Sequence, residues 1–205
     1  MKFSNSEIDV LREIGNIGVG NAATALASLL QAKVSIKLPR VAFLELEEAI
    51  ESIGGLEQPV VCVNLQVGGD ISATLLFIFD QESACALVEL LLDREKGTVT
   101  ALDEMGRSVV MEIGNILTGS FTGAIATMTG LRLVPSVPVL AHDMLGALFT
   151  DSVASSGYLD ERVLCIQTSF LGAFNQDQVD SHMILLPDID SLDHLFEALG
   201  VAAAG

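Results

Sequence analysis

The sequence Glu-Ile-Gly-Asn-Ile occupies residues 13–17, and the same five residues return at 112–116, 99 positions later. A five-residue word recurs by chance in a chain of 205 residues with odds of roughly one in a hundred, so the flanking sequence must support the match. Three flanking pairs share the same offset: Gly20 with Gly119, Ala25 with Ala124, and Pro39 with Pro138. The chain is therefore predicted to contain an internal duplication.

A later segment extends the duplication. Val-Val-Cys-Val at 60–63 resembles Val-Leu-Cys-Ile at 163–166, now 103 positions later, which implies a short insertion in the second copy. No linker rich in proline and serine separates the copies. We therefore expect one pseudo-symmetric domain over residues 1–205, built of two repeats at about 1–99 and 100–205.

Apolar periodicity and turn residues predict a mixture of helices and strands. Helices are expected over 6–31, 45–53, 81–95, 103–129, 142–154 and 189–199. Strands are expected over 33–38, 41–46, 59–67, 70–80, 162–172 and 178–186, with a proline-punctuated extended segment over 131–139. Gly68-Gly69 indicates a hairpin. The predicted fold class is α+β, an antiparallel sheet with helices packed on it.

The repeated word lies on a predicted helix, and its polar residues share one side of that helix. At 100° per residue, four residues of the first copy fall within about 60° of arc: Asp9, Glu13, Asn16 and Gly20. Their counterparts in the second copy are Ser108, Glu112, Asn115 and Gly119. The apolar residues expected to point inward are Val10, Leu11, Ile14, Ala22, Ala25 and Leu29, and in the second helix Val109, Val110, Ile113, Leu117, Phe121 and Met128.

Glycine and asparagine are unusual in the middle of a helix, because Gly costs about 1 kcal/mol relative to Ala and Asn costs a few tenths. Gly15 and Gly114 fall at the edge of the apolar stripe, where a missing side chain permits close packing. Gly20 and Gly119 fall on the polar face, where it leaves room for a docked surface.

Glu and Asn at positions i and i+3 project side by side. A carboxylate can pair with a cation, and a carboxamide can hold and orient a water molecule. This pair suits the positioning of water in a partner's active site better than covalent catalysis. A solvated helix face without function is the other interpretation.

The pattern Asp/Ser-x3-Glu-x2-Asn, followed after 22 residues by Pro, resembles the signature of the CheC/CheX/FliY family of chemotaxis phosphatases. It occurs as Asp9, Glu13, Asn16 and Pro39, and again as Ser108, Glu112, Asn115 and Pro138. The chain is most similar to the two-site members of that family. CheX-type members keep one intact site, and FliY-type members carry further segments.

The resemblance implies hydrolysis of the aspartyl phosphate of the response regulator CheY. Glu13 and Glu112 would bind a lysine of CheY, and Asn16 and Asn115 would orient the attacking water. No cofactor or metal of the chain's own is expected, because the Mg²⁺ of the reaction belongs to CheY. The alternative function is a non-catalytic adaptor that sequesters CheY or CheD through the same faces.

The family also binds the receptor deamidase CheD through a helix in its second half. The stretch 142–152 resembles that helix. Asp143, Met144 and Leu148 are the candidate contacts.

Composition argues against several other classes of function. Half of the residues are hydrophobic, mean hydropathy is +0.54, and the net charge is −17 from 27 acidic and 10 basic residues. Such a surface disfavours nucleic acid as a partner, and the apolar content is too high for a disordered acidic tail. The apolar runs are too short to span a bilayer, and the N-terminal residues lack the pattern of a secretory signal. A cytoplasmic monomer is expected.

The acidic excess is spread over both copies. Residues 1–100 carry 14 acidic and 7 basic side chains, residues 101–205 carry 13 and 3, and the chain has four lysines. A diffuse acidic surface poor in lysine is typical of proteins from a high-salt cytoplasm, where self-repulsion is screened. A halophilic archaeal source is our hypothesis.

Three further signals are interpreted as structural. Cys62, Cys85 and Cys165 lie in apolar stretches without a CxxC pair, which predicts buried thiols in a reducing compartment. The GxGxxA match at 18–23 lies inside a predicted helix and does not follow a strand, so nucleotide binding is not expected. The histidines at 142, 182 and 194 are too widely spaced to indicate a metal site.

Overall fold

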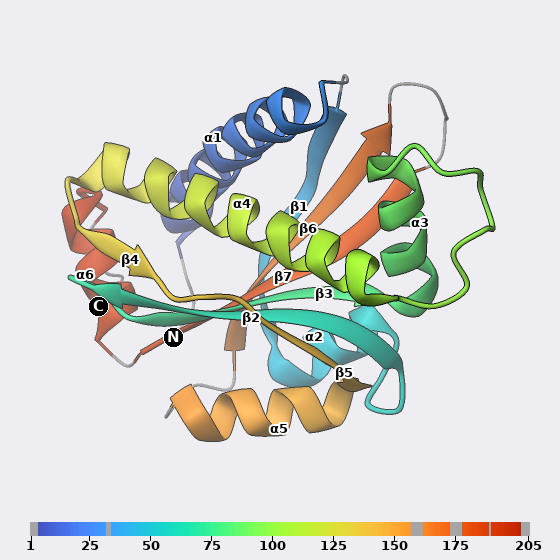
Figure 1. The fold of residues 1–205 in the computed structure, drawn as a ribbon. Coiled ribbons are helices and arrows are strands. Elements are labelled where there is room, and N and C mark those ends of the chain that lie inside the picture. Colours follow the sequence, from blue (N-terminus) through green and yellow to red (C-terminus); the bar gives the residue numbers. More distant parts are fainter. Residues whose placement is uncertain (1–3, 32–33, 157–161, 173–177, 189, 202–205) are drawn as a thin grey trace.

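The computed structural model describes residues 4–31, 34–156, 162–172, 178–188 and 190–201 (Figure 1). The first copy of the repeat contains α1 (Asn5–Leu30), β1 (Val34–Glu45), α2 (Leu46–Ile53), β2 (Pro59–Gly69), β3 (Ala73–Asp80) and α3 (Gln81–Leu91). The second copy contains α4 (Glu104–Thr129), β4 (Leu133–Pro135), β5 (Val139–Met144), α5 (Leu145–Ser156), β6 (Arg162–Gly172), β7 (Gln178–Pro187) and α6 (Ser191–Ala198). Both copies have the same order of elements, except that the strand after the first helix is divided into β4 and β5 in the second copy.

The strands form one antiparallel sheet in which the two copies are interleaved. β3 and β7 pair in its middle. From there the sheet continues through β6 to β1 on one side and through β2 to β4 and β5 on the other. The first strand of each copy therefore pairs with the second strand of the other copy.

The outer strand pairings of the two copies have equivalent registers, related by the offsets of the sequence repeat. Val41 of β1 faces Ile166 of β6, and Leu140 of β5 faces Val63 of β2. The offset of 99 residues carries Val41 onto Leu140, and the offset of 103 carries Val63 onto Ile166. The predicted pseudo-twofold relation is thus present in the strand pairing as well as in the sequence.

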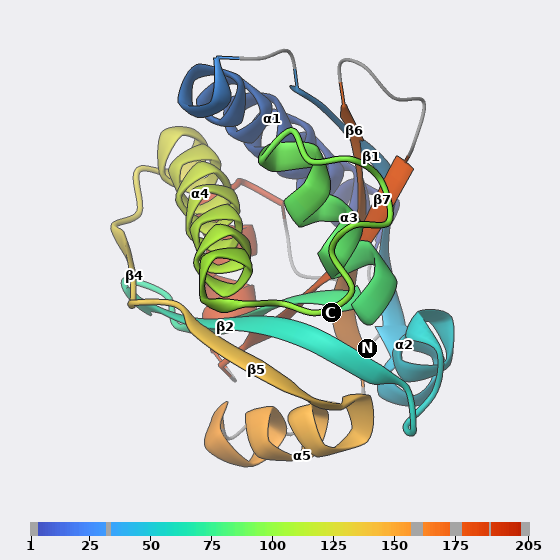
Figure 2. The same cartoon turned by 45° about the vertical axis from the view of Figure 1, so that its right-hand side comes forward.

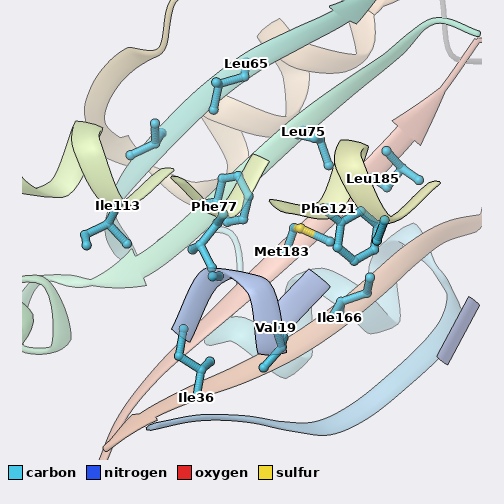
Figure 3. Close-up of a cluster of buried hydrophobic side chains, with 14 of the residues drawn as sticks. Val19, Ile36, Leu65, Leu75, Phe77, Ile113, Phe121, Ile166, Met183 and Leu185 are labelled. Atoms are coloured by element: carbon cyan, nitrogen blue, oxygen red, sulfur yellow. The ribbon is translucent and has the colours of Figure 1, made fainter. Parts of the chain in front are cut away.

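Helices cover both faces of the sheet. α1, α3, α4 and α6 pack on one face, and α2 and α5 pack on the other (Figures 1 and 2). Figure 3 shows part of the larger core, where Phe77 of β3 and Met183 of β7 cluster with Val19 of α1 and Phe121 of α4. The smaller core, under α2 and α5, includes Ile50, Cys62, Phe149, Cys165 and Ile184.

Each motif helix begins at a side-chain cap. Ser4 and Glu7 form a capping box on α1, in which the Glu7 N–H donates to Ser4 Oγ (3.3 Å) and the Ser4 N–H donates to Glu7 Oε2 (2.6 Å). Asp103 caps α4 by accepting from the Gly106 N–H at 2.7 Å. A cap contributes about 1 kcal/mol to helix stability. Both caps stand nine positions before the motif glutamate, so they set the same helical register in each copy.

Two helix glycines are required by close packing. A Cβ added at Gly114 of α4 would lie 2.6 Å from Val63 Cγ1 of β2, and one added at Gly18 of α1 would lie 3.0 Å from the Phe121 ring of α4. Gly114 therefore fits α4 against the sheet, as its place on the helical wheel predicts. Gly18 fits α1 against α4.

The apolar stripes differ in part from the prediction. Leu11, Ile14 and Ala22 are buried on α1 as expected, but Ala25 is exposed and Leu29 is 57% exposed. Val19 and Leu26 are buried in their place, and Met128 near the end of α4 is exposed as well. The buried side of the helix turns gradually along its length, which a single helical wheel cannot represent.

Element boundaries differ from the sequence prediction at three places. The strands predicted on either side of Pro39 are one strand, β1, whose register with β6 shifts between Lys37 and Arg40. Proline has no N–H to donate to the ladder, which accounts for the irregularity. The helix predicted over 142–154 begins only at Leu145, because residues 142–144 extend β5 by pairing with β2. The helix predicted over 81–95 ends at Leu91.

The three cysteines are free and buried, as predicted. Desolvation raises the pKa of the Cys62 thiol to about 12 and that of Cys165 to about 11. Both stay protonated at neutral pH.

One described helix, α4, is long and apolar enough to cross a membrane by length and composition alone. Half of its most apolar window is buried inside the protein, and buried core helices pass the same test.

Replacement of Gly114 by Ala tests the contact between α4 and the sheet. Gly114→Ala should lower the free energy of unfolding by about 1–3 kcal/mol, because the new methyl group overlaps Val63. The matched control is Gly119→Ala on the same helix, where a Cβ meets nothing within 4 Å. That control should be stabilised by up to about 1 kcal/mol. Urea denaturation measures both, and equal effects would contradict the packing argument.

Separate expression of residues 1–99 and 100–205 tests the prediction of a single domain, because the interleaved sheet takes strands from both halves. Each half alone loses the partners of its outer strands, so neither should show a cooperative thermal transition by circular dichroism. Mixing or co-expressing the halves should restore it. Two halves that each unfold cooperatively on their own would overturn the prediction.

Candidate functional site

The predicted polar face of α1 lies on the molecular surface. Asp9, Glu13, Asn16 and Gly20 are all exposed. Apart from the helix's own backbone, no atom of the described residues lies within 4 Å of where a Cβ of Gly20 would stand, so a docking surface could approach the helix there. The buried contact of Gly18 with α4 falls two residues after Asn16, on roughly the opposite side of the helix. The polar face of α1 therefore points away from α4.

The face of α4 repeats this arrangement. Ser108, Glu112, Asn115 and Gly119 are exposed, and a Cβ at Gly119 also meets open space. α1 and α4 lie side by side on the sheet (Figures 1 and 2). The structure thus carries two copies of an exposed Glu/Asn pair on neighbouring helices.

The two faces differ at the first position of the motif. Asp9 forms an ion pair with Arg12, whose Nη1 lies 2.7 Å from Asp9 Oδ1. Both side chains are more than half exposed, so the pair contributes little to stability. In α4, Ser108 Oγ instead donates to the backbone carbonyl of Glu104 at 3.0 Å. Arg12 corresponds to Met111, so only the first face carries a cation beside the motif glutamate.

Arg12 was not among the residues singled out from the sequence. It lies about 40° from Asn16 on the helical wheel, so helical periodicity alone places it beside the motif. Its pairing with Asp9 became evident only from the structure.

Chemically, both faces are open helix surfaces. An exposed carboxylate and a carboxamide one helical turn apart can bind a cation and orient a water molecule. An open face does not exclude bulk solvent from a reaction, so a partner must supply the enclosed part of the site. Within the described ranges, no group of three or more His, Cys, Asp or Glu side chains could hold a metal ion.

The two motif prolines lie outside the helical faces. Pro39 interrupts the register of β1 with β6, and Pro138 lies directly before β5. Each proline therefore marks an irregularity in the strand that follows its motif helix.

The three residues proposed as CheD contacts do not share a helix. Asp143 and Met144 are the last residues of β5, where they face Val60 and Pro59 of β2. Only Leu148 lies on α5, and it is half-buried. The prediction of one helix over 142–152 was therefore wrong. Pairing of residues 142–144 with β2 outweighs the helical pattern of the sequence.

Known proteins share the motif segments and the fold. The model of the CheC-like family matches residues 7–42 and 105–142, which cover most of both motif helices and of the strands after them. The chain is 35% identical over 202 residues to the protein named CheY-P phosphatase CheC of Bacillus subtilis (strain 168), which covers 98% of this chain and 97% of that protein.

Two further comparisons concern FliY proteins. The flagellar motor switch phosphatase FliY of Bacillus subtilis (strain 168) is 29% identical over 137 residues, 66% of this chain and 35% of that protein. The crystal structure of FliY from Thermotoga maritima matches the fold with a TM-score of 0.80 at 18% identity, covering 98% of both chains. The comparison with the CheY-P phosphatase CheC, at 35% identity over nearly the full length of both proteins, shows that this chain belongs to the CheC-like family.

Proposed function

We propose that this protein is a phosphatase that hydrolyses the aspartyl phosphate of phosphorylated CheY. One observation carries the proposal: two exposed Glu/Asn pairs in the same helical register, in a chain that is 35% identical to a protein named CheY-P phosphatase CheC. Phosphorylated CheY supplies the phosphoryl group and the enclosed pocket around it. The exposed helix face supplies the groups that enter this pocket.

The reaction transfers the phosphoryl group from an aspartate of CheY to water. Water attacks phosphorus, the bond from phosphorus to the aspartate oxygen breaks, and the products are the free carboxylate and inorganic phosphate. The carboxamide of Asn16 or Asn115 would hold the attacking water in line with that bond. The carboxylate of Glu13 or Glu112 would bind a lysine of CheY and fix the orientation of the complex. The Mg²⁺ of this reaction belongs to CheY, and its charge would stabilise the phosphoryl oxygens.

The open space over Gly20 and Gly119 supports the same arrangement. An inserting side chain must be brought within hydrogen-bonding distance of the phosphoryl group, which requires the two backbones to approach closely. A residue without a side chain one turn after the asparagine leaves room for that approach.

We further propose that CheD binds to the region of β5 and α5, that the protein acts as a monomer, and that it works in the cytoplasm.

The double variant Asn16→Ala with Asn115→Ala tests the mechanism. It should reduce the rate of phosphate release from phosphorylated CheY by about 100-fold or more if positioning of water is the main contribution. Asn21→Ala is the matched control, because Asn21 is an exposed asparagine of α1 outside the polar face. It should leave the rate unchanged. Each single variant measures the share of its own face.

The assay should use catalytic amounts of the protein and measure phosphate release over several turnovers. Release beyond one equivalent distinguishes a phosphatase from an adaptor that sequesters CheY. A double variant with the normal rate would rule out the proposed role of the asparagines. A wild-type protein that binds phosphorylated CheY without turnover would favour the adaptor.

We also infer that the protein works in a cytoplasm of high salt concentration. The net charge of −17 and the scarcity of lysine support this inference. The free energy of unfolding should rise between low and molar KCl, because the Debye length falls to about 3 Å and screens the self-repulsion. Urea denaturation at several KCl concentrations measures it, and equal stability throughout would argue against a halophilic origin.

A further inference from the structure

A polar hollow of about 110 Å³ lies on the side of the sheet that α2 and α5 cover. Arg40 of β1, Gln167 of β6, His182 of β7 and Ser52 of α2 line it, together with the apolar side chains of Ala42 and Leu44. α1 and α4, which carry the Glu/Asn pairs, lie on the opposite face of the sheet (Figures 1 and 2). The hollow is therefore separate from the site described above.

The register of the sheet brings three of the lining residues into one row. Arg40 faces Gln167 across the pairing of β1 with β6, and Gln167 faces His182 across that of β6 with β7. A guanidinium, a carboxamide and an imidazole thus stand on three adjacent strands. Ser52 closes the hollow from α2, with its hydroxyl donating to the Ala49 carbonyl at 2.7 Å.

The duplication provides an internal comparison for this row. In the other half of the sheet, Val139 faces Asn64, and Asn64 faces Leu76. These residues occupy the pseudo-symmetric places of Arg40, Gln167 and His182. The same fold is built there with two apolar side chains, so the fold itself does not require a cation and an imidazole at these places.

The charged groups around the hollow favour a ligand that carries a single negative charge. Among the described residues, no carboxylate lies within salt-bridge distance of the Arg40 guanidinium. Its positive charge lowers the pKa of Cys165, although burial raises that pKa more strongly, to about 11. Burial lowers the pKa of His182, while Asp180 and Asp80 raise it. The two carboxylates beside His182 would repel a dianion more than a monoanion.

Volume limits the ligand further. The hollow of about 110 Å³ is open beside the exposed Arg40 and Ser52, so it takes up one small group and leaves the rest of a longer ligand outside. A planar carboxylate matches the fork of the guanidinium, and the amide of Gln167 can donate to it. Ala42 and Leu44 provide a surface for a short apolar tail.

We propose that this hollow is a binding site for a small monocarboxylate, held by Arg40 and Gln167 with its short chain against Ala42 and Leu44. The carboxylate is that of a small organic acid or of a glutamate side chain on a protein partner. Both sources present the same chemistry to the pocket, and they are separated by experiment.

Titration of ¹⁵N-labelled protein with sodium propionate tests the proposal. The side-chain amide of Gln167 and the backbone amides around Ser52 and His182 should shift in a saturable manner. Arg40→Ala should weaken propionate at least about tenfold, because it removes a charge-assisted hydrogen bond. Arg94→Ala, which removes an exposed arginine of the loop after α3, should bind as the wild type does. Thermal unfolding of each variant verifies that it is folded.

Two additional probes define the ligand. Inorganic phosphate should bind more weakly than propionate, and tighter binding of phosphate would overturn the monocarboxylate assignment. A blocked tripeptide Gly-Glu-Gly that binds while Gly-Gln-Gly does not would assign the site to a partner's glutamate, and binding of propionate alone would assign it to a free acid. Shifts that do not saturate with either probe, or an Arg40→Ala variant that binds propionate normally, would overturn the proposal.

Discussion

The pairing of β3 with β7 is the interaction on which the rest of the structure depends. It joins the two copies of the repeat in the middle of the sheet. On either side of it, the first strand of each copy pairs with the second strand of the other copy. In the described part of the chain the outer strands pair only across the copies, so one copy cannot complete the sheet. The duplicated sequence thus produces one sheet with related halves, and the motif helices occupy equivalent places on it.

This placement decides what the motif can do. α1 and α4 bury one side against the sheet and each other, with Gly18 and Gly114 permitting the closest contacts. The opposite sides are exposed and remain open to a partner. A reaction that needs an enclosed pocket must therefore be completed by the partner, which fits a protein that inserts groups into the active site of another.

Duplication also makes departures from symmetry informative. The two motif faces share Glu, Asn and Gly but differ in Asp9 with Arg12 against Ser108 with Met111. The opposite side of the sheet departs further, with a polar row in one half and a largely apolar one in the other. Since both halves have the same backbone arrangement, the fold alone does not require these differences.

The sequence by itself determined the repeat, the α+β class, the antiparallel pairing within the β2–β3 hairpin and the exposure of both Glu/Asn pairs. These follow from local periodicity, which a helix or strand obeys wherever it packs. Tertiary structure decided the interleaving of the strands, the end of β5 at Met144, the gradual turn of the buried side of α1, and the meeting of Arg40, Gln167 and His182. Those features depend on contacts between segments more than 60 residues apart or on which neighbour an element meets, and local pattern carries no information about either.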